Sequence, residues 1–154
     1  FYDADSVFHA LPTSTNQTYT KKYFDSSPVR ADSKANWKVI RYADVLLMYA
    51  EALNENGKPQ QAIPFLNQVR TRAGLEGYPN TMSQTETRDA IVLERRLELS
   101  FEGVRWFDLV RTGKAYEVMK DKGMAPYMTV FPIPLSQVQI INDPTIFPQN
   151  PGYD

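Results

Sequence analysis

Apolar residues repeat at helical spacing between positions 37 and 74, and this pattern restricts the fold more than any other feature of the chain. The first run lies on one helix face: Val39, Tyr42, Ala43, Leu46, Ala50 and Leu53. Asn56 and Gly57 supply a left-handed stop, and Pro59 suits the first turn of a second helix. The second run ends at Gly74 and shares one face: Ala62, Leu66, Val69 and Ala73. Helices joined by so few residues form an antiparallel αα-hairpin.

The spacing of small residues in this hairpin resembles a tetratricopeptide repeat (TPR) unit. Ala50 and Ala62 allow the two helices to approach closely, while larger apolar residues fill the groove between them. Only one copy of the unit is evident, and a single repeat cannot bury its own face. We therefore expect an all-α fold, in which this chain is a fragment of a larger helical protein and further helices pack on the hairpin.

A second helical region, residues 84–122, places many charged residues among apolar ones. It begins after Ser83, which has capping-box spacing to Glu86. Its buried stripe is expected at helical spacing: Ala90, Leu93, Leu97 and Phe101. Further along, the spacing of Trp106 and Phe107 favours core packing over ligand stacking.

Seven residues of this region form a candidate ion-pair network: Glu94, Arg95, Glu98, Glu102, Arg105, Asp108 and Arg111. The glutamates stand four apart and repel each other, whereas acids and arginines three apart along the segment attract. The alternative is a carboxylate pair for glycoside hydrolysis, which requires one acid of raised pKa. Neighbouring arginines would keep the glutamates ionised. We therefore favour a structural network, assign no catalytic residue and do not expect an enzyme.

The two ends of the chain lack this helical pattern. Residues 1–36 form an irregular aromatic and polar segment, and residues 126–154 hold six of the eleven prolines. Such a proline density predicts an ordered coil that wraps over the helices. The candidate ligand-binding residues are aromatics among hydroxyl and amide side chains: Tyr2, Tyr19, Tyr23 and Phe24. This mixture suits stacking on sugar faces, and ordinary loop packing is the alternative.

Composition narrows the function further. Seventeen basic and eighteen acidic residues leave a net charge of -1, which disfavours binding to nucleic acid. The chain has no cysteine, and its only histidine, His9, lacks a recognisable nucleophile or orienting carboxylate. Asp3, Asp5 and Asp25 lack the spacing of a calcium loop. We therefore expect neither a metal nor a cofactor, and no stretch approaches the roughly twenty apolar residues of a spanning helix.

Four segments in a fixed order carry a family resemblance: "RYADVLLMYAEALNENGKPQQAIPFLNQVRTRAGL", "ERRLELSFEGVRWFDLVRTGKA", "FPIP" and "QNPGY". Together they resemble the C-terminal half of the SusD/RagB family, which are outer-membrane nutrient-binding lipoproteins of Bacteroidetes. The match covers about residues 37–154, divided into the hairpin (37–74), the charged helices (84–122) and the proline-rich tail (126–154).

This resemblance implies a helical body with TPR-like hairpins arranged as an alpha-alpha superhelix. It also implies a surface-exposed lipoprotein, held in the outer membrane by an N-terminal lipid anchor outside this chain. Such a protein binds a glycan or other nutrient, as in starch utilization, and lids a SusC-type TonB-dependent transporter. The matched charged residues would then be framework positions, with Arg41, Asp44 and Glu51 among them. The alternative is a TPR-like protein-interaction scaffold that does not bind glycans directly.

Overall fold

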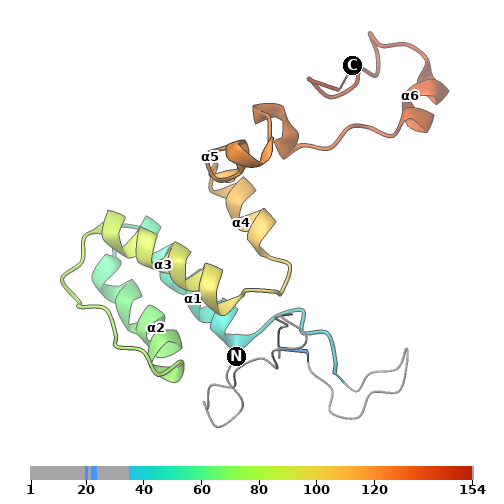
Figure 1. The fold of residues 1–154 in the computed structure, drawn as a ribbon. Helices are drawn as coiled ribbons and strands as arrows, with labels where there is room; N and C mark the ends of the chain where they lie inside the picture. The colour runs from blue at the N-terminus through green and yellow to red at the C-terminus, as the bar shows by residue number, and fades with distance from the viewer. Residues whose placement is uncertain (1–19, 21, 24–34, 154) are drawn as a thin grey trace. The chain divides into compact units, whose positions relative to one another are not determined.

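The computed structural model describes residues 20, 22, 23 and 35–153, and helices are the only regular secondary structure in this part of the chain. They contain six α-helices and two short 3-10 helices, with no strand among them (Figure 1). Two compact units divide the chain, the first ending at Gly103 and the second beginning at Val104. The expected fold class is therefore confirmed. None of the described helices is both long and apolar enough to cross a membrane.

Helices α1 (Tyr42–Glu55) and α2 (Pro59–Arg72) form the expected hairpin. Gly57 adopts a φ of +72°, the left-handed conformation that ends a helix, and Pro59 occupies the first turn of α2. Ala50 and Ala62 are both fully buried, so the helices approach closely where their side chains are small. The helical pattern extends from Trp37 in the sequence, but α1 itself begins only at Tyr42.

Helix α3 (Gln84–Glu98) packs against both α1 and α2 and completes a three-helix unit (Figure 1). Its start has the expected capping box. The Ser83 amide donates to the Glu86 carboxylate at 2.8 Å, and the Glu86 amide donates to the Ser83 hydroxyl at 3.3 Å. Asn54 and Gln84 tie α1 to α3 by donating their side-chain amides to each other's carbonyl oxygens, at 3.1 and 2.7 Å.

The buried face of α3 differs from the expected stripe. Ala90 is buried, but the prediction is wrong for Leu93, Leu97 and Phe101, which are 44%, 54% and 74% exposed. Five residues of the helix are buried, and two of them, Glu94 and Arg95, are charged; the other three are Thr87, Ala90 and Ile91. Charge can be buried on this face because α1 and α2 supply oppositely charged partners for it.

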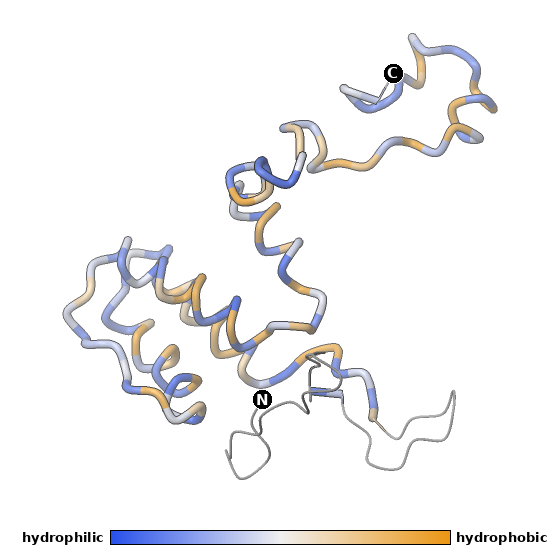
Figure 2. The backbone as a smooth tube through the Cα atoms, viewed as in Figure 1, coloured by the Kyte–Doolittle hydropathy of each residue, from blue (hydrophilic) through white to orange (hydrophobic). Residues whose placement is uncertain are grey.

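The core of the three-helix unit consists of apolar side chains from all three helices: Leu46, Leu47, Ala50, Ala62, Leu66, Val69, Ala90 and Ile91. The helices of this unit carry both hydrophobic and hydrophilic residues, as Figure 2 shows. Leu47 and Leu66 are completely shielded from solvent, and a side chain of this size contributes about 1.5–3 kcal/mol when it is fully buried.

The second unit consists of short helices joined by turns: α4 (Arg105–Arg111), α5 (Ala115–Met119), η1 (Lys120–Lys122), η2 (Pro126–Thr129) and α6 (Leu135–Ile141). Leu109 and Ala115 are buried in this unit, whereas Phe107 is 70% exposed and Trp106 is half-buried. The core position expected for Phe107 is therefore wrong. The tail also contains more helix than the expected coil, since η2 and α6 both lie within it.

The C-terminal segment folds back on residues 130–133, which joins two of the motifs quoted from the sequence. The Gln149 side-chain amide forms two hydrogen bonds with the backbone of Ile133: its oxygen accepts from the Ile133 amide at 2.6 Å, and its nitrogen donates to the Ile133 carbonyl at 2.9 Å. The Tyr153 hydroxyl donates to the Val130 carbonyl at 2.8 Å. Its ring also meets Tyr127 edge to face, 5.1 Å between centroids. We call this arrangement the C-terminal clasp.

Candidate functional site

A single arginine that precedes α1, Arg41, holds two glutamates: Glu98 at the end of α3 and Glu102 four residues further along the chain. The Arg41 guanidinium binds the Glu102 carboxylate through two hydrogen bonds, Nε to Oε2 at 2.9 Å and Nη2 to Oε1 at 2.7 Å. Its Nη1 donates to Glu98 at 2.8 Å. Arg41 is the N-cap residue of α1, and Glu98 is the last residue of α3. These contacts therefore join the two helices, between Arg41 and residues 57 and 61 positions further along the chain.

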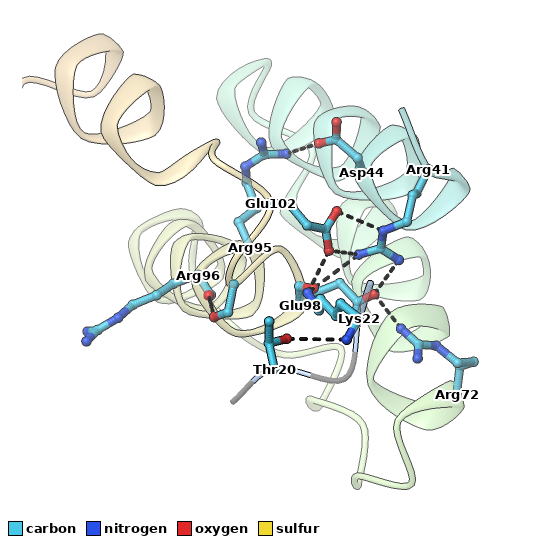
Figure 3. Close-up of polar contacts among 10 residues, drawn as sticks. Thr20, Lys22, Arg41, Asp44, Arg72, Arg95, Arg96, Glu98 and Glu102 are labelled. Atoms are coloured by element: carbon cyan, nitrogen blue, oxygen red, sulfur yellow. Dashed lines mark hydrogen bonds and ion pairs between the residues drawn. The ribbon is translucent and has the colours of Figure 1, made fainter. Parts of the chain in front are cut away.

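Two further cations reach the same carboxylates (Figure 3). The Lys22 ammonium lies 2.6 Å from Glu102 and donates to the backbone carbonyl of Glu98 at 2.5 Å. Arg72, the last residue of α2, lies 2.5 Å from the Glu98 carboxylate. The cluster therefore collects charged groups from the start of α1, the end of α2, the end of α3 and the segment around residue 22.

The electrostatics of the cluster favour ionised groups. Burial raises the pKa of Glu102, but hydrogen bonds from Arg41 and Lys22 outweigh it and hold that pKa below its usual value. The same hydrogen bond to Glu102 raises the pKa of Arg41, against the opposing effect of burial. A general acid for glycoside hydrolysis needs a carboxyl of raised pKa. Glu102 has the opposite property.

Deeper in the unit, two ion pairs fix α3 against the hairpin. Glu94 is 2% exposed and lies 2.9 Å from Arg70 of α2. Arg95 is 6% exposed and lies 2.8 Å from Asp44 of α1. The partners that the sequence suggested for this helix were three residues away, whereas these lie 24 and 51 positions away.

The remaining members of the expected network lie in α4 of the second unit. Asp108 is 9% exposed and pairs with Arg111 at 2.8 Å, as the spacing of three residues predicts. Arg105 takes part in none of the ion pairs found among the described residues. The charged segment is thus divided between the two units, with Glu94, Arg95, Glu98 and Glu102 in the first.

A pocket of about 280 Å³ opens beside the cluster in the first unit. It is lined by both acidic and basic side chains, an aromatic ring and one leucine: Lys22, Tyr23, Lys38, Arg41, Arg72, Leu97, Glu98 and Glu102. Among the described residues, no group of three or more His, Asp or Glu side chains is arranged to hold a metal ion. The lining of the pocket offers charged and hydrogen-bonding side chains.

Tyr23 is the only candidate ligand-binding residue of the sequence that the structure describes, and it lines this pocket. Its ring stacks on Trp37 with centroids 5.2 Å apart and planes 7° apart. Trp37 is 64% exposed, and the Tyr23 hydroxyl is buried without a hydrogen-bond partner among the residues that the structure describes. The other three candidates, Tyr2, Tyr19 and Phe24, lie outside the described residues, as does His9.

Sequence reasoning missed Trp37 and Lys38 as site residues because they begin the helical pattern and were assigned to the hairpin. One local feature of the sequence indicates their position. The segment "NWK" lies just before Arg41 of the matched motif, so its residues lie near any cluster that contains Arg41. The short distance along the chain between Trp37 and Arg41 limits how far apart they can lie.

The first unit is a helical hairpin with a third helix packed against it and a charged pocket on its surface, which places the chain among the all-α helical-hairpin proteins. The chain belongs to the SusD family, because the model of that family matches residues 9–130. Members of this family are non-catalytic binding proteins. Glu94, Glu98 and Glu102 are consistent with that description, since each is held in an ion pair.

Relatives of known name support the assignment. The chain is 32% identical to SusD-like protein P2 of Formosa agariphila over 90% of its own length, and 48% identical to SusD-like protein P38 of the same organism over 53%. These matches span 31% and 18% of the two relatives, so the chain covers less than a third of either protein.

Solved structures agree with the fold. A SusD homologue from Bacteroides thetaiotaomicron matches 86% of the chain with a TM-score of 0.72 and 32% identity, over 30% of its own length. A laminarin-binding SusD-like protein matches 84% of the chain with a TM-score of 0.61 and 40% identity, over 26% of its own length.

Proposed function

We propose that this chain is part of a non-catalytic, SusD-like glycan-binding lipoprotein on the outer-membrane surface. In this proposal the whole protein works with a SusC-type TonB-dependent transporter in the uptake of polysaccharide or oligosaccharide. Membership of the SusD family supports the proposal, and one relative of 40% identity is described as laminarin-binding. The chain's own contribution is a helical frame and a sugar-contacting surface.

The observation that carries this proposal is the Tyr23–Trp37 stack at the edge of the pocket. Sugar rings have an apolar face that packs on aromatic rings, and their hydroxyls need hydrogen-bonding groups close by. Trp37 offers a largely exposed ring, and polar side chains line the pocket beside Tyr23. We assign these two aromatics as the sugar platform of the described part of the chain.

The ion pairs of α3 serve this platform as a frame. Arg41 lies four residues after Trp37 and is fixed by three hydrogen bonds to the carboxylates of Glu98 and Glu102. Lys22 precedes Tyr23 and is fixed by the same two glutamates. The cluster therefore anchors both segments that carry the stacked aromatics. Arg95 adds to this frame through its ion pair with Asp44 of α1, while the pair of Asp108 and Arg111 has a structural role within the second unit.

Binding of laminarin oligosaccharides to the full-length protein, measured by calorimetry, tests the proposal. Trp37→Ala is expected to weaken binding at least tenfold, since loss of one aromatic anchor commonly costs more than about 1.4 kcal/mol. Tyr116→Ala is the matched control, because Tyr116 is a partly exposed aromatic residue of the second unit that takes no part in the Tyr23–Trp37 stack. If laminarin and a panel of other glycans fail to bind the unmodified protein, glycan binding is not its function.

A TPR-like protein-interaction scaffold is the second candidate, and exposed apolar residues on α1 favour it. Tyr42, Val45, Met48 and Tyr49 are 42–72% exposed in the three-helix unit. Such residues are typical of surfaces that contact another protein. This function predicts that the full-length protein co-purifies with a transporter while Trp37→Ala changes neither that association nor nutrient uptake. Loss of uptake in this variant would contradict a purely protein-binding role.

A further inference from the structure

The pocket beside the Tyr23–Trp37 stack carries more positive charge than its glutamates neutralise. Four of its lining residues are basic and two are acidic, which gives a formal charge of +2: Lys22, Lys38, Arg41, Arg72, Glu98 and Glu102. The whole chain, by contrast, has a net charge of -1. The positive charge is therefore a local property of this pocket.

The four cations differ in how their charge is used. Arg41 and Lys22 form ion pairs with the two carboxylates, at distances of 2.6–2.8 Å. Arg72 reaches Glu98 with one nitrogen, Nη2, and its side chain remains 62% exposed. Lys38 is exposed and forms no ion pair with any described residue. Lys38 and most of the Arg72 guanidinium are therefore available to a ligand.

We propose that this pocket binds an acidic sugar, with the carboxylate of a uronic acid or a sulfate ester held between Lys38 and Arg72. The inference rests on the proposed glycan-binding function and specifies its ligand class. A guanidinium can donate two parallel hydrogen bonds to two oxygens of a planar carboxylate or of a tetrahedral sulfate, and an ammonium adds a mobile point charge. The neighbouring aromatic stack receives the apolar face of the same sugar ring.

Neutral glycans leave this pocket incompletely matched. A neutral sugar can stack on Trp37 and accept hydrogen bonds, but it leaves Lys38 without a counter-charge and Arg72 with only its single contact to Glu98. A volume of about 280 Å³ lies near the lower end of ligand pockets, so the site accepts about one charged sugar residue of a longer chain.

The test compares three probes on the full-length protein: laminarin oligosaccharides, the same oligosaccharides oxidised at C6 to the uronate, and the same oligosaccharides carrying sulfate esters. At low ionic strength, we expect at least one charged probe to bind about tenfold more tightly than the neutral one, as two partly exposed ion pairs of about 0.7 kcal/mol each would give. This ratio should shrink at 0.5 M salt because exposed charges are screened. The tighter of the two charged probes identifies the anionic group.

Variants locate the preference. Lys38→Gln combined with Arg72→Gln should bring the ratio of charged to neutral affinity close to one. Lys38→Gln alone should reduce it about threefold without touching the contact between Arg72 and Glu98. Lys58→Gln removes an exposed lysine that does not line the pocket, and should leave the ratio unchanged.

The outcomes separate this inference from the proposed function. Equal affinity for neutral and charged probes, or a preference that persists in the double variant, overturns the acidic-sugar site while leaving glycan binding intact. Failure of all three probes to bind overturns glycan binding and the acidic-sugar site together. A preference that disappears with the two substitutions but not with Lys58→Gln supports the site.

Discussion

Replacement of Glu94 by leucine tests whether the buried charge of α3 is structural. Glu94 is 2% exposed and pairs with Arg70 at 2.9 Å, so Glu94→Leu removes the carboxylate and leaves the guanidinium without its counter-charge. The Arg70 side chain is 16% exposed, so its charge is only partly hydrated. The variant therefore creates a poorly compensated charge between α2 and α3.

The magnitude follows from what Arg70 keeps. Removing one partner of a buried ion pair costs about 3–5 kcal/mol. Arg70 retains a hydrogen bond from Nε to the Glu76 carbonyl at 2.9 Å, and its guanidinium lies 4.2 Å from the centroid of the Tyr78 ring. These contacts and the residual exposure place the cost near the lower limit, about 3 kcal/mol. Replacing both partners by apolar residues removes the stranded charge. Arg70→Met with Glu94→Leu should therefore cost only about 1 kcal/mol, chiefly the lost contacts to Tyr78 and Glu76.

Urea unfolding followed by circular dichroism at 222 nm measures these differences, and amide hydrogen exchange assigns them to α2 and α3. Glu117→Gln, which removes one member of an exposed pair with Lys114, is the control and should change stability little. The reasoning is refuted if Glu94→Leu costs less than about 1 kcal/mol, or if the double variant is no more stable than the single one.

Three further predictions concern other parts of the chain. The fold lowers the pKa of Glu102, so the Glu102 carboxyl binds a proton more tightly in the unfolded chain than in the folded one. Ionised Glu102 therefore stabilises the fold fully above about pH 4.5, and this stabilisation is lost as the pH falls through the lower pKa of the folded state. Glu102→Gln should therefore flatten the acid dependence of the urea midpoint below pH 4.5, and an unchanged dependence would contradict this. Leu47→Ala should cost about 2–5 kcal/mol in the same assay because Leu47 is fully buried, and a loss below about 1 kcal/mol would indicate a loosely packed core. Gly152→Ala should open the C-terminal clasp, since the new Cβ would lie 2.5 Å from the Tyr127 ring at a φ of +88°; faster exchange of the Ile133 amide is the measurement, and unchanged protection would argue against the clasp.

The helical hairpin could be predicted from the sequence because its signals are local. Asn56 and Gly57 stop α1, Pro59 starts α2, and Ser83 caps α3, each through backbone preferences that act within a few residues. The apolar spacing of α1 and α2 also identified core residues such as Ala50 and Leu66 correctly. Family membership could likewise be read from the order of the motifs, and the match over residues 9–130 confirms it.

The buried face of α3 could not be read in this way. Spacing favoured Leu93 and Leu97, whereas the structure buries Glu94 and Arg95. Burial of a charged side chain is costly unless an oppositely charged partner is buried beside it, so apolar spacing alone predicts that charged residues are exposed. Here the partners of Glu94 and Arg95 belong to other helices, α2 and α1. The sequence identifies the charged residues but does not say which helix will face them.

The sequence by itself determined the hairpin of α1 and α2, the cap of α3, the family, and the aromatic and charged composition near residues 22 to 41. Only the tertiary structure decided that Arg41, Lys22 and Arg72 meet on Glu98 and Glu102, and that Tyr23 and Trp37 stack beside them. Helix formation depends on interactions between residues three or four apart. The site depends on contacts between residues as many as 80 positions apart, which exist only after the three helices have packed.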